Sequence, residues 1–465
     1  MKKSDVVVFV SAGMLSPKKR DHVLARRQLY LNYGALSLAT ILDATGLKTL
    51  LFHGEHEQPS VALRMLIESG SLPSRFPVMV SIPSFYALPW ASAFCQLLRT
   101  AFPSSKIIVG GRWVVGPDPE WLQKKLPAAD LLVPGLGEPL IQRLVNGVDD
   151  VRRLSAPTPD QVLNHRLVFD HERYQPSVEA SRGCGMGCAF CEERDIRLEK
   201  LRSPDQIACA IAAVSSQYNG GQIRPYLQSS MFLPSERWAS ALANSVSELG
   251  LNVHWRTETR VDALRPETIP YLAKAGMRVL DLGLETASPQ QIVSMHKSSD
   301  PERYLRRASL LLRACRESGV ATKVNVLLYA GETSKTLDET RTFLDEHIDS
   351  IAGVSVGPVV AYGPPKIADA LLEEWAKSGA TPVDSNSAAE TGISQLHLSR
   401  EIDQAEAESA SLELSRRYMD ASSYFQLKSF SYYARDYTRK DFDNDVRASP
   451  SSRLPFRTDM DLTRD

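Results

Sequence analysis

Short apolar runs alternate with amphipathic stretches over the first 150 residues of the chain. Five runs have the length and composition of buried strands, at residues 6–10, 49–52, 78–82, 106–109 and 131–133. Stretches with helical periodicity follow them, at residues 31–44, 61–68, 90–102, 119–125 and 138–146. Five such alternations predict an α/β domain with a doubly wound, Rossmann-like parallel sheet.

The same alternation begins again near residue 178. We predict strands at residues 178–181, 225–228, 253–256, 279–282, 322–328 and 354–360. Helices are predicted between them at residues 205–217, 236–249, 266–275, 303–318 and 337–347. Six β/α units predict a partial (β/α)6 barrel, with its chemistry at the carboxyl ends of the strands.

The remaining segments have other patterns. Residues 149–175 carry charges and prolines with little periodicity, which indicates a linker. Beyond residue 366 the chain becomes helical, and an aromatic-rich stretch at 424–437 is expected to pack as core. The last twenty residues are polar and are predicted to form a loose tail. We therefore divide the chain into residues 1–148, 149–175, 176–366 and 367–465, the last a helical cap and tail.

Composition excludes several classes of protein. The 465 residues include 54 Lys and Arg against 55 Asp and Glu, so no basic stripe for gripping nucleic acid is expected. No stretch approaches the roughly 20 apolar residues that span a bilayer, and the first apolar run is too short for a signal peptide. Six cysteines are too few for a disulfide-rich secreted scaffold. The expectation is a cytoplasmic protein with reduced thiols and no membrane or nucleic-acid partner.

Three of the six cysteines lie within eight residues. Cys184, Cys188 and Cys191 have the spacing C-x3-C-x2-C, and the glycines between the first two allow the loop to fold tightly. Three thiolates can bind three irons of a four-iron, four-sulfur cluster and leave the fourth iron open. An open metal position is typical of a catalytic site. Phe190 precedes the third cysteine and could shield such a cluster from solvent.

Two simpler interpretations compete with this one. A structural zinc site requires a fourth ligand, and no further Cys or His lies within ten residues on either side of the three cysteines. The trio could also be incidental buried cysteines. The other cysteines lie in predicted helices and are expected to be small buried hydrophobes: Cys95, Cys209 and Cys315.

A C-x3-C-x2-C loop after the first strand of a β/α barrel resembles the radical S-adenosylmethionine (SAM) superfamily. The aromatic residue before the third cysteine matches as well. The resemblance implies an open iron that binds the amino and carboxylate groups of SAM. It also implies SAM cleavage on reduction, usually to methionine and a 5′-deoxyadenosyl radical, with an electron donor such as flavodoxin or ferredoxin.

Other segments resemble the same family in the expected order. They are residues 255–262, residues 282–288 with the following 295–297, and residues 329–333, where Ala330 replaces the usual proline. By resemblance, Arg260 and Glu285 contact the ribose or carboxylate of SAM; a barrel salt bridge and a surface charge are the alternatives. The second-strand motif that cradles the SAM amino group is poorly matched, and Gln228 and Ser229 stand in its place.

A doubly wound domain before such a barrel resembles the cobalamin-binding subgroup of the family. The residues implied in cobalamin binding follow the third, fourth and fifth strands: Ser81, Gly110, Gly111, Gly135 and Gly137. The subgroup's D-x-H-x-x-G motif is absent, and His53 and His56 have the wrong spacing for it. The alternatives are tight turns and a vestigial domain used for packing or substrate binding.

The resemblance implies a SAM-cleaving enzyme, a transferase that modifies a small molecule or natural-product intermediate. With cobalamin the expected reaction is methyl transfer. Without it, rearrangement, cyclisation or oxidation is expected, and transfer of the 3-amino-3-carboxypropyl group of SAM is a further alternative. The non-enzymatic alternative is an iron–sulfur or corrinoid sensor. The sequence does not identify the substrate.

Overall fold

The computed structural model describes residues 2–16, 23–116, 118–147, 161–220 and 222–458. They form two compact units. Unit 1 comprises residues 1–173, 361–371 and 384–394, and unit 2 comprises residues 174–360, 372–383 and 395–465. Much of the predicted linker, residues 148–160, lies outside the described residues. Two short segments after residue 360 thus belong with unit 1, whereas the predicted C-terminal region begins at residue 367.

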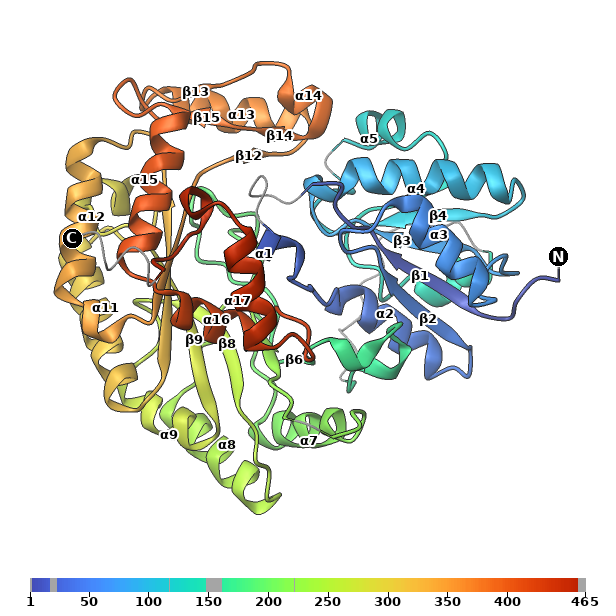
Figure 1. Ribbon diagram of the computed structural model, residues 1–465, viewed down its shortest axis with the longest axis horizontal. Helices are drawn as coiled ribbons and strands as arrows, with labels where there is room; N and C mark the ends of the chain where they lie inside the picture. Colours follow the sequence, from blue (N-terminus) through green and yellow to red (C-terminus); the bar gives the residue numbers. More distant parts are fainter. Residues whose placement is uncertain (1, 17–22, 117, 148–160, 221, 459–465) are drawn as a thin grey trace. The chain divides into compact units, whose positions relative to one another are not determined.

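Unit 1 contains a five-stranded sheet of order β2-β1-β3-β4-β5 (Figure 1). Every pairing in it is parallel. Its strands are β1 (Val7–Ser11), β2 (Thr49–His53), β3 (Val78–Ser81), β4 (Ile107–Gly110) and β5 (Leu131–Val133). The predicted doubly wound parallel sheet is confirmed, and each of its strands lies within two residues of its expected position.

Helices connect and follow these strands in the described residues up to 147. They are α1 (Val23–Arg26), α2 (Tyr33–Asp43), α3 (Pro59–Glu68), α4 (Leu88–Ala101), α5 (Pro119–Lys125) and α6 (Ile141–Val145). One core cluster joins Val8, Val10 and Val80 of the sheet to residues of α3 and α4, while α2 contacts β1 and β2. Side chains on both faces of β1 are buried, which explains why its first four residues are all apolar.

Unit 2 contains six parallel strands in the order β11-β10-β9-β8-β7-β6. The strands are β6 (Ser177–Glu179), β7 (Tyr226–Gln228), β8 (Trp255–Arg260), β9 (Met277–Glu285), β10 (Ala321–Leu328) and β11 (Gly353–Pro358). Each strand pairs with its neighbours in sequence, and β6 and β11 are the two edges. This is the predicted partial barrel.

Helices lie between these strands, and four of those named here begin with a side-chain cap. The helices are α7 (Pro204–Ser215), α8 (Glu236–Glu248), α9 (Ile269–Lys274), α10 (Pro289–Ser294), α11 (Pro301–Glu317) and α12 (Ser334–Glu346). Ser203 and Thr333 form capping boxes at the starts of α7 and α12. The short helix α10, directly after β9, was not predicted separately.

The two faces of the unit 2 sheet differ in polarity. One face carries fully buried apolar side chains such as Leu227, Leu282 and Val324. The other, here called the polar face, carries contacting polar side chains: Tyr226, Arg256, Glu258, Asp281, Lys323 and Asn325. This alternation follows from the two-residue period of a strand.

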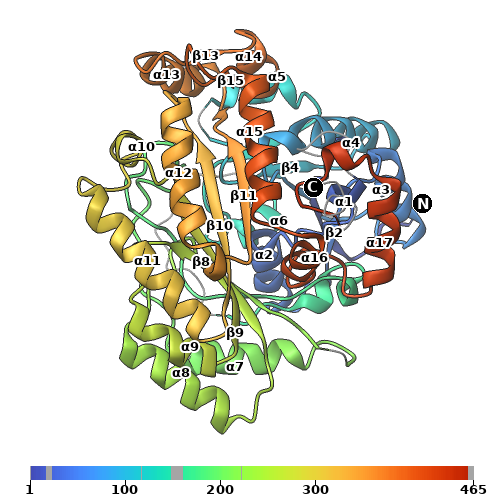
Figure 2. The same cartoon turned by 60° about the vertical axis from the view of Figure 1, so that its left-hand side comes forward.

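Small strands and further helices complete the chain. They are β12 (Ala361–Tyr362), α13 (Pro365–Ala376), β13 (Thr381–Pro382), α14 (Ser387–Thr391), β14 (Ile393–Ser394), β15 (Leu396–His397), α15 (Gln404–Arg417), α16 (Ala421–Ser429) and α17 (Arg439–Ala448). Figure 2 shows α15 beside β11, which it contacts.

The aromatic stretch packs as core, as expected, but the prediction of a loose tail is wrong for its described part. Tyr424 contacts the rings of Phe442 and Phe456. Leu454 and Phe456 are each only 1% exposed, and the backbone N–H of Ala421 donates to the carbonyl of Arg457. Buried side chains such as these pack the otherwise polar segment against the helices.

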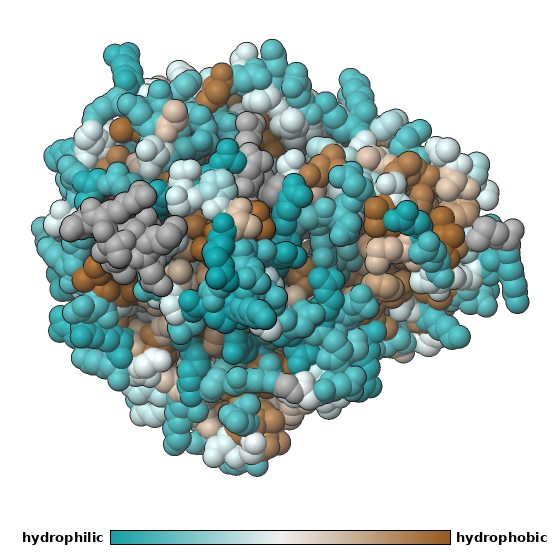
Figure 3. All heavy atoms as spheres, viewed as in Figure 1, coloured by the Kyte–Doolittle hydropathy of each residue, from teal (hydrophilic) through white to brown (hydrophobic). Residues whose placement is uncertain are grey.

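The face drawn in Figure 3 is mostly hydrophilic, with apolar residues in separate small groups. Within the part of the chain that the structure describes, no helix has both the length and the apolar character needed to cross a bilayer.

Candidate active site

The cysteine loop follows β6 and folds back on residues 196–198. Gly183, Gly185 and Gly187 all have left-handed backbone conformations, with φ of 74°, 66° and 72°. A side chain at Gly183 would place its Cβ 2.2 Å from the carbonyl oxygen of Arg197, so only glycine fits there. Sequence reasoning noted the two later glycines and missed this first one.

The three thiols differ in exposure, and two of their sulfurs each accept an N–H hydrogen bond. Cys188 is buried, while Cys184 and Cys191 are partly exposed. The Cys188 Sγ accepts from Arg260 Nη1 at 3.4 Å, and the Cys191 Sγ accepts from the backbone N–H of Glu193 at 3.4 Å. Burial raises the pKa of the Cys191 thiol to about 11, and the neighbouring thiols Cys188 and Cys184 add to the rise.

The free thiolate is thus disfavoured at Cys191, and coordination to a cluster iron would stabilise it. Thiolates that each bind a different iron of a four-iron cluster need not converge on one point. Among the described residues, no group of three His, Cys, Asp or Glu side chains is arranged so that it could hold a metal ion.

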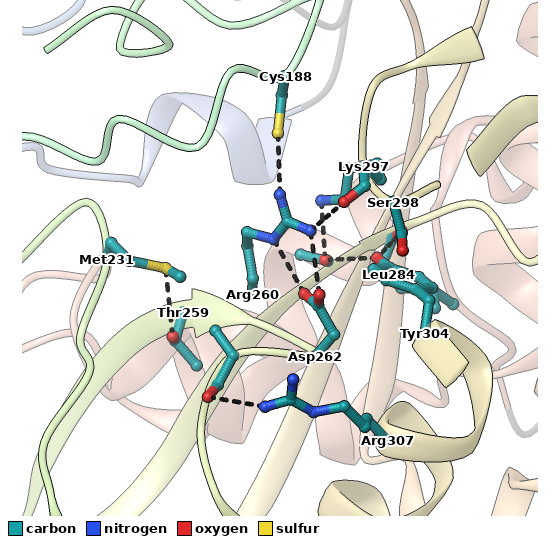
Figure 4. Close-up of polar contacts among 12 residues, drawn as sticks. Cys188, Met231, Thr259, Arg260, Asp262, Leu284, Lys297, Ser298, Tyr304 and Arg307 are labelled. Carbon is teal, nitrogen blue, oxygen red and sulfur yellow. Dashed lines mark hydrogen bonds and ion pairs between the residues drawn. The ribbon is translucent and has the colours of Figure 1, made fainter. Parts of the chain in front are cut away.

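Arg260 ends β8 and reaches the cysteine loop (Figure 4). Its guanidinium donates to both carboxylate oxygens of Asp262 at 2.9 and 3.1 Å, to the Lys297 carbonyl and to Cys188. The salt bridge considered as an alternative is therefore present, and the same group also contacts a predicted cluster ligand.

Glu285 ends β9 in a left-handed conformation, with φ of 63°. Its carboxylate lies over Gly283, since a Cβ there would be 2.8 Å from Oε1. Lys297 Nζ lies 3.5 Å from Oε1 and donates to the Gly283 carbonyl at 3.1 Å. The absent side chain at position 283 thus makes room for an ion pair between Glu285 and a buried lysine.

Lys297 is a functional candidate that the sequence reasoning left without a role. Its Nζ lies 5.9 Å from the centre of the Phe190 ring, and its carbonyl accepts from Arg260. One residue therefore contacts Glu285, Arg260 and the aromatic residue of the cysteine loop. The signal was its place in the segment 295–297, which follows the motif containing Glu285.

Phe190 belongs to a row of aromatic side chains. Its ring meets that of Tyr329 edge-on at 6.2 Å, and the Trp375 indole N–H donates to the Tyr329 hydroxyl at 2.7 Å. These contacts give the loop an apolar flank on one side.

Gln228 and Ser229, at the end of β7, bond to groups around β6. Gln228 Nε2 donates to the Ser177 hydroxyl at 3.0 Å, and the hydroxyls of Ser229 and Ser181 are 2.7 Å apart. Ser181 leads directly into the cysteine loop, so these contacts bring the end of β7 against the start of the loop.

The candidate cobalamin residues lie at the carboxyl ends of β3, β4 and β5 in unit 1. At Gly111 an added Cβ would be 2.3 Å from the Ile82 carbonyl, and at Gly137 it would be 3.0 Å from Leu38 Cδ1. Packing explains these two glycines. Gly110 and Gly135 have more room, since no atom lies within 3.8 Å of an added Cβ at either position.

A strand order of 2-1-3-4-5 places the topological switch point between β1 and β3, where doubly wound sheets bind ligands. The Asn32 side chain bridges these two ends, donating to the Ser11 and Ser81 hydroxyls at 3.0 Å each. Sequence reasoning identified Ser81 and missed Ser11 and Asn32. His53 is buried beside them and accepts from the Asn32 backbone N–H, and burial lowers its pKa to about 3.

Comparison with known proteins bears on both units. Residues 178–344 match the model of the radical SAM superfamily. No functionally curated protein is significantly similar in sequence.

Solved structures of two enzymes are among those that share the fold. One is the radical S-adenosylmethionine methyltransferase TsrM from Kitasatospora setae, solved with tryptophan substrate and a SAM analogue. It is 16% identical, with 76% of this chain and 73% of TsrM covered and a TM-score of 0.57. The other is OxsB, a cobalamin-dependent S-adenosylmethionine radical enzyme solved with aqua-cobalamin and SAM.

OxsB is 17% identical, with 80% of this chain covered and a TM-score of 0.58, but this chain spans only 56% of OxsB. At such identity the likeness establishes the fold. The cysteine loop, its place after the first strand of a six-stranded parallel sheet and the family match agree: residues 178–344 form a domain of the radical SAM superfamily.

Proposed function

We propose that this enzyme uses a [4Fe–4S] cluster bound by Cys184, Cys188 and Cys191 to cleave SAM, and that it methylates a small molecule with the help of cobalamin. The observation that carries the proposal is the cysteine loop at the end of β6, with the guanidinium of Arg260 bonded to the Cys188 sulfur. Such a loop leaves one iron without a protein ligand, and that position is the one SAM requires.

The residues present suit this cluster. Three left-handed glycines bend the loop, and two N–H groups point at its sulfurs, as hydrogen bonds in iron–sulfur sites do. When bound, the cluster supplies an electron and an open coordination position. The electron comes from a donor such as flavodoxin or ferredoxin.

The surrounding side chains have separable tasks in this proposal. Glu285 accepts hydrogen bonds from the SAM ribose. Lys297 holds the Glu285 carboxylate in place, with Nζ 3.5 Å from Oε1. Gln228 and Ser229 bind the SAM amino group at the end of β7. Arg260 fixes the Cys188 sulfur relative to the turn that contains Lys297. Phe190 keeps water from the cluster.

Cobalamin binding rests on unit 1. Its strand order, the Ser11–Asn32–Ser81 bridge at the switch point and the open backbone at Gly110 and Gly135 support a ligand at the carboxyl ends of the strands. When bound, cobalamin supplies a carrier for the methyl group. The methyltransferase TsrM and the cobalamin-dependent OxsB have this fold, which favours the same assignment.

A second candidate function is a radical SAM reaction without cobalamin. It is favoured by the absence of a D-x-H-x-x-G motif and by the burial of His53, whose Nε2 already accepts a hydrogen bond. The product would then be a rearranged, cyclised or oxidised small molecule.

Anaerobic purification after growth with hydroxocobalamin tests the proposal. We expect a brown protein with about four irons per chain, a retained corrinoid spectrum and SAM turnover to S-adenosylhomocysteine on reduction. 5′-Deoxyadenosine alone, without corrinoid, would favour the second candidate. Methylthioadenosine would indicate transfer of the aminocarboxypropyl group. A colourless protein containing zinc that leaves SAM intact would contradict both.

A further inference from the structure

Glu258 differs from the other residues of its strand in its exposure to solvent. Among the six residues of β8 it is exposed, while the other five are buried. The strand lies in the interior of the sheet, between β7 and β9. Its carboxylate accepts a hydrogen bond from the Tyr226 hydroxyl, which places it on the polar face.

The basic side chains near this carboxylate, within the part of the chain that the structure describes, are paired with another acid. Asp281 takes both nearby cations, pairing with Arg256 Nη2 at 2.6 Å and with Lys323 Nζ at 3.2 Å. Arg256 also donates to the Leu427 carbonyl at 2.6 Å. Among the described residues Glu258 forms no ion pair within 4.0 Å, and its side-chain hydrogen bond comes from the Tyr226 hydroxyl at 3.2 Å.

The position of Glu258 relates it to the proposed SAM site. It precedes Arg260 by two residues on the same face of β8, which is a rise of about 7 Å. Arg260 contacts Cys188, and the Arg256–Asp281 pair lies on the opposite side of Glu258 along the strand. A ligand on Glu258 would thus lie one side-chain layer from the cysteine loop.

An anion held among protein groups without a counter-charge is costly unless a ligand supplies the charge. Although the side chain is exposed, the surrounding sheet partly desolvates it; this desolvation, with the charge of Asp281, raises the pKa of Glu258 to about 7. The neighbouring cations Lys323 and Arg256 offset only part of this rise, because both are engaged by Asp281.

We propose that Glu258, oriented by the Tyr226 hydroxyl, binds a positively charged nitrogen of the substrate on the polar face of the unit 2 sheet. The substrate class is a small molecule with a protonated amine or another basic nitrogen. This inference rests on the proposed function in one respect, the identification of the bound amine as the substrate. SAM also carries an ammonium group, so the test must separate the two sources.

The test compares pairs of probes that differ only in the charged group: benzylamine with benzyl alcohol, and 2-phenylethylamine with 2-phenylethanol. Their dissociation constants are measured at pH 8, where Glu258 is ionised and the amines are protonated, on anaerobically reconstituted wild type and Glu258→Gln. We expect each amine to bind the wild type about tenfold more tightly than its alcohol. In Glu258→Gln the ratio falls to about one. Glu248→Gln, at the exposed end of α8, is the matched control and keeps the preference.

SAM binding and iron content are measured on the same samples. Unchanged iron and SAM affinity in Glu258→Gln would assign the lost amine preference to the substrate site. A tenfold loss of SAM affinity would overturn the proposal, because Glu258 would then belong to the SAM site. Equal binding of amines and alcohols to the wild type would also overturn it.

A wild type without iron would refute the proposed function while leaving the amine measurement valid. If Glu258→Gln does not fold, Tyr226→Phe provides a second measurement. It removes the hydrogen bond that orients the carboxylate, and we expect the preference to fall about threefold. An unchanged preference there would contradict the role given to Tyr226.

Discussion

The three clustered cysteines and the three scattered ones can be separated by substitution. We expect Cys184→Ala, Cys188→Ala and Cys191→Ala each to lose the iron and the visible absorption, and to abolish SAM cleavage. Each removes one of three ligands to a cluster that has no protein ligand to spare. Cys209→Ala is the matched control: the expectation that Cys209 is buried was wrong, since it is exposed on α7, and its removal should leave all three properties unchanged. Iron retained at the wild-type level in any of the three variants would remove that cysteine from the ligand set.

Gly283 offers a substitution that moves one functional group. A methyl group at this position would meet Glu285 Oε1 at 2.8 Å, the end of a flexible side chain, so the carboxylate must move while the backbone stays. We expect Gly283→Ala to fold with a melting temperature within a few degrees of wild type and to bind SAM about tenfold more weakly, as for one lost hydrogen bond to a charged group. Equilibrium dialysis with SAM measures this. Wild-type affinity in a folded variant would show that Glu285 does not contact SAM.

At the scale of single elements, the Arg256–Asp281–Lys323 cluster ties β8, β9 and β10 together across the polar face. Burial raises the pKa of Asp281, but Arg256 and Lys323 outweigh it and lower the pKa to about 2. Asp281→Asn leaves two cations facing a neutral amide, and we expect it to lower the free energy of unfolding by about 3–5 kcal/mol. Urea unfolding at pH 7 measures the loss, and a loss under 1 kcal/mol would contradict the ion-pair assignment.

The same cluster predicts a pH dependence. Because the folded pKa lies below the unfolded value of about 3.8, the unfolded chain takes up the proton first as the pH falls. The contribution of Asp281 is therefore complete above about pH 4 and is lost as the pH falls toward 2. Wild type should lose stability more steeply than Asp281→Asn over this range. Equal slopes would show that Asp281 is not held ionised.

The buried side chain of Phe456 is predicted to stabilise the packing of α16 and α17. Phe456 is 1% exposed and contacts the rings of Tyr424 and Phe442. Phe456→Ala should lower the free energy of unfolding by about 3–5 kcal/mol, as for other large core truncations. Arg453→Ala, a short distance before it on an exposed position, is the control. A neutral Phe456→Ala would restore the interpretation of this segment as a loose tail.

For the molecule as a whole, the strands of unit 1 were predictable because each contains a short apolar run between turn residues. The parallel order of both sheets follows from the helices between those runs. The polar face of unit 2 was not predicted as a site, because residues such as Glu258, Asp281 and Lys323 resemble the solvent side of ordinary strands. Only the register of β8, β9 and β10 shows that they meet.

Site residues that lie close together in the sequence were predictable from their spacing. Site residues that meet only in the folded chain were not. The cysteines share one loop, so their pattern is visible in the sequence. Arg260 and Glu285 were identified through family resemblance, and the structure adds their contacts with Cys188 and Lys297. Lys297, Ser11 and Asn32 are single polar residues whose partners lie on other elements, so no local pattern marks them.

The central claim is that the three cysteines hold a four-iron cluster whose open iron binds SAM. Electron paramagnetic resonance of the reduced, anaerobically reconstituted protein tests it most directly, with and without SAM. We predict the signal of a [4Fe–4S]+ cluster in wild type, a change in its g values when SAM is added, and no such signal in Cys188→Ala. A signal that SAM leaves unchanged, or a protein that binds zinc and gives no signal, would contradict the claim.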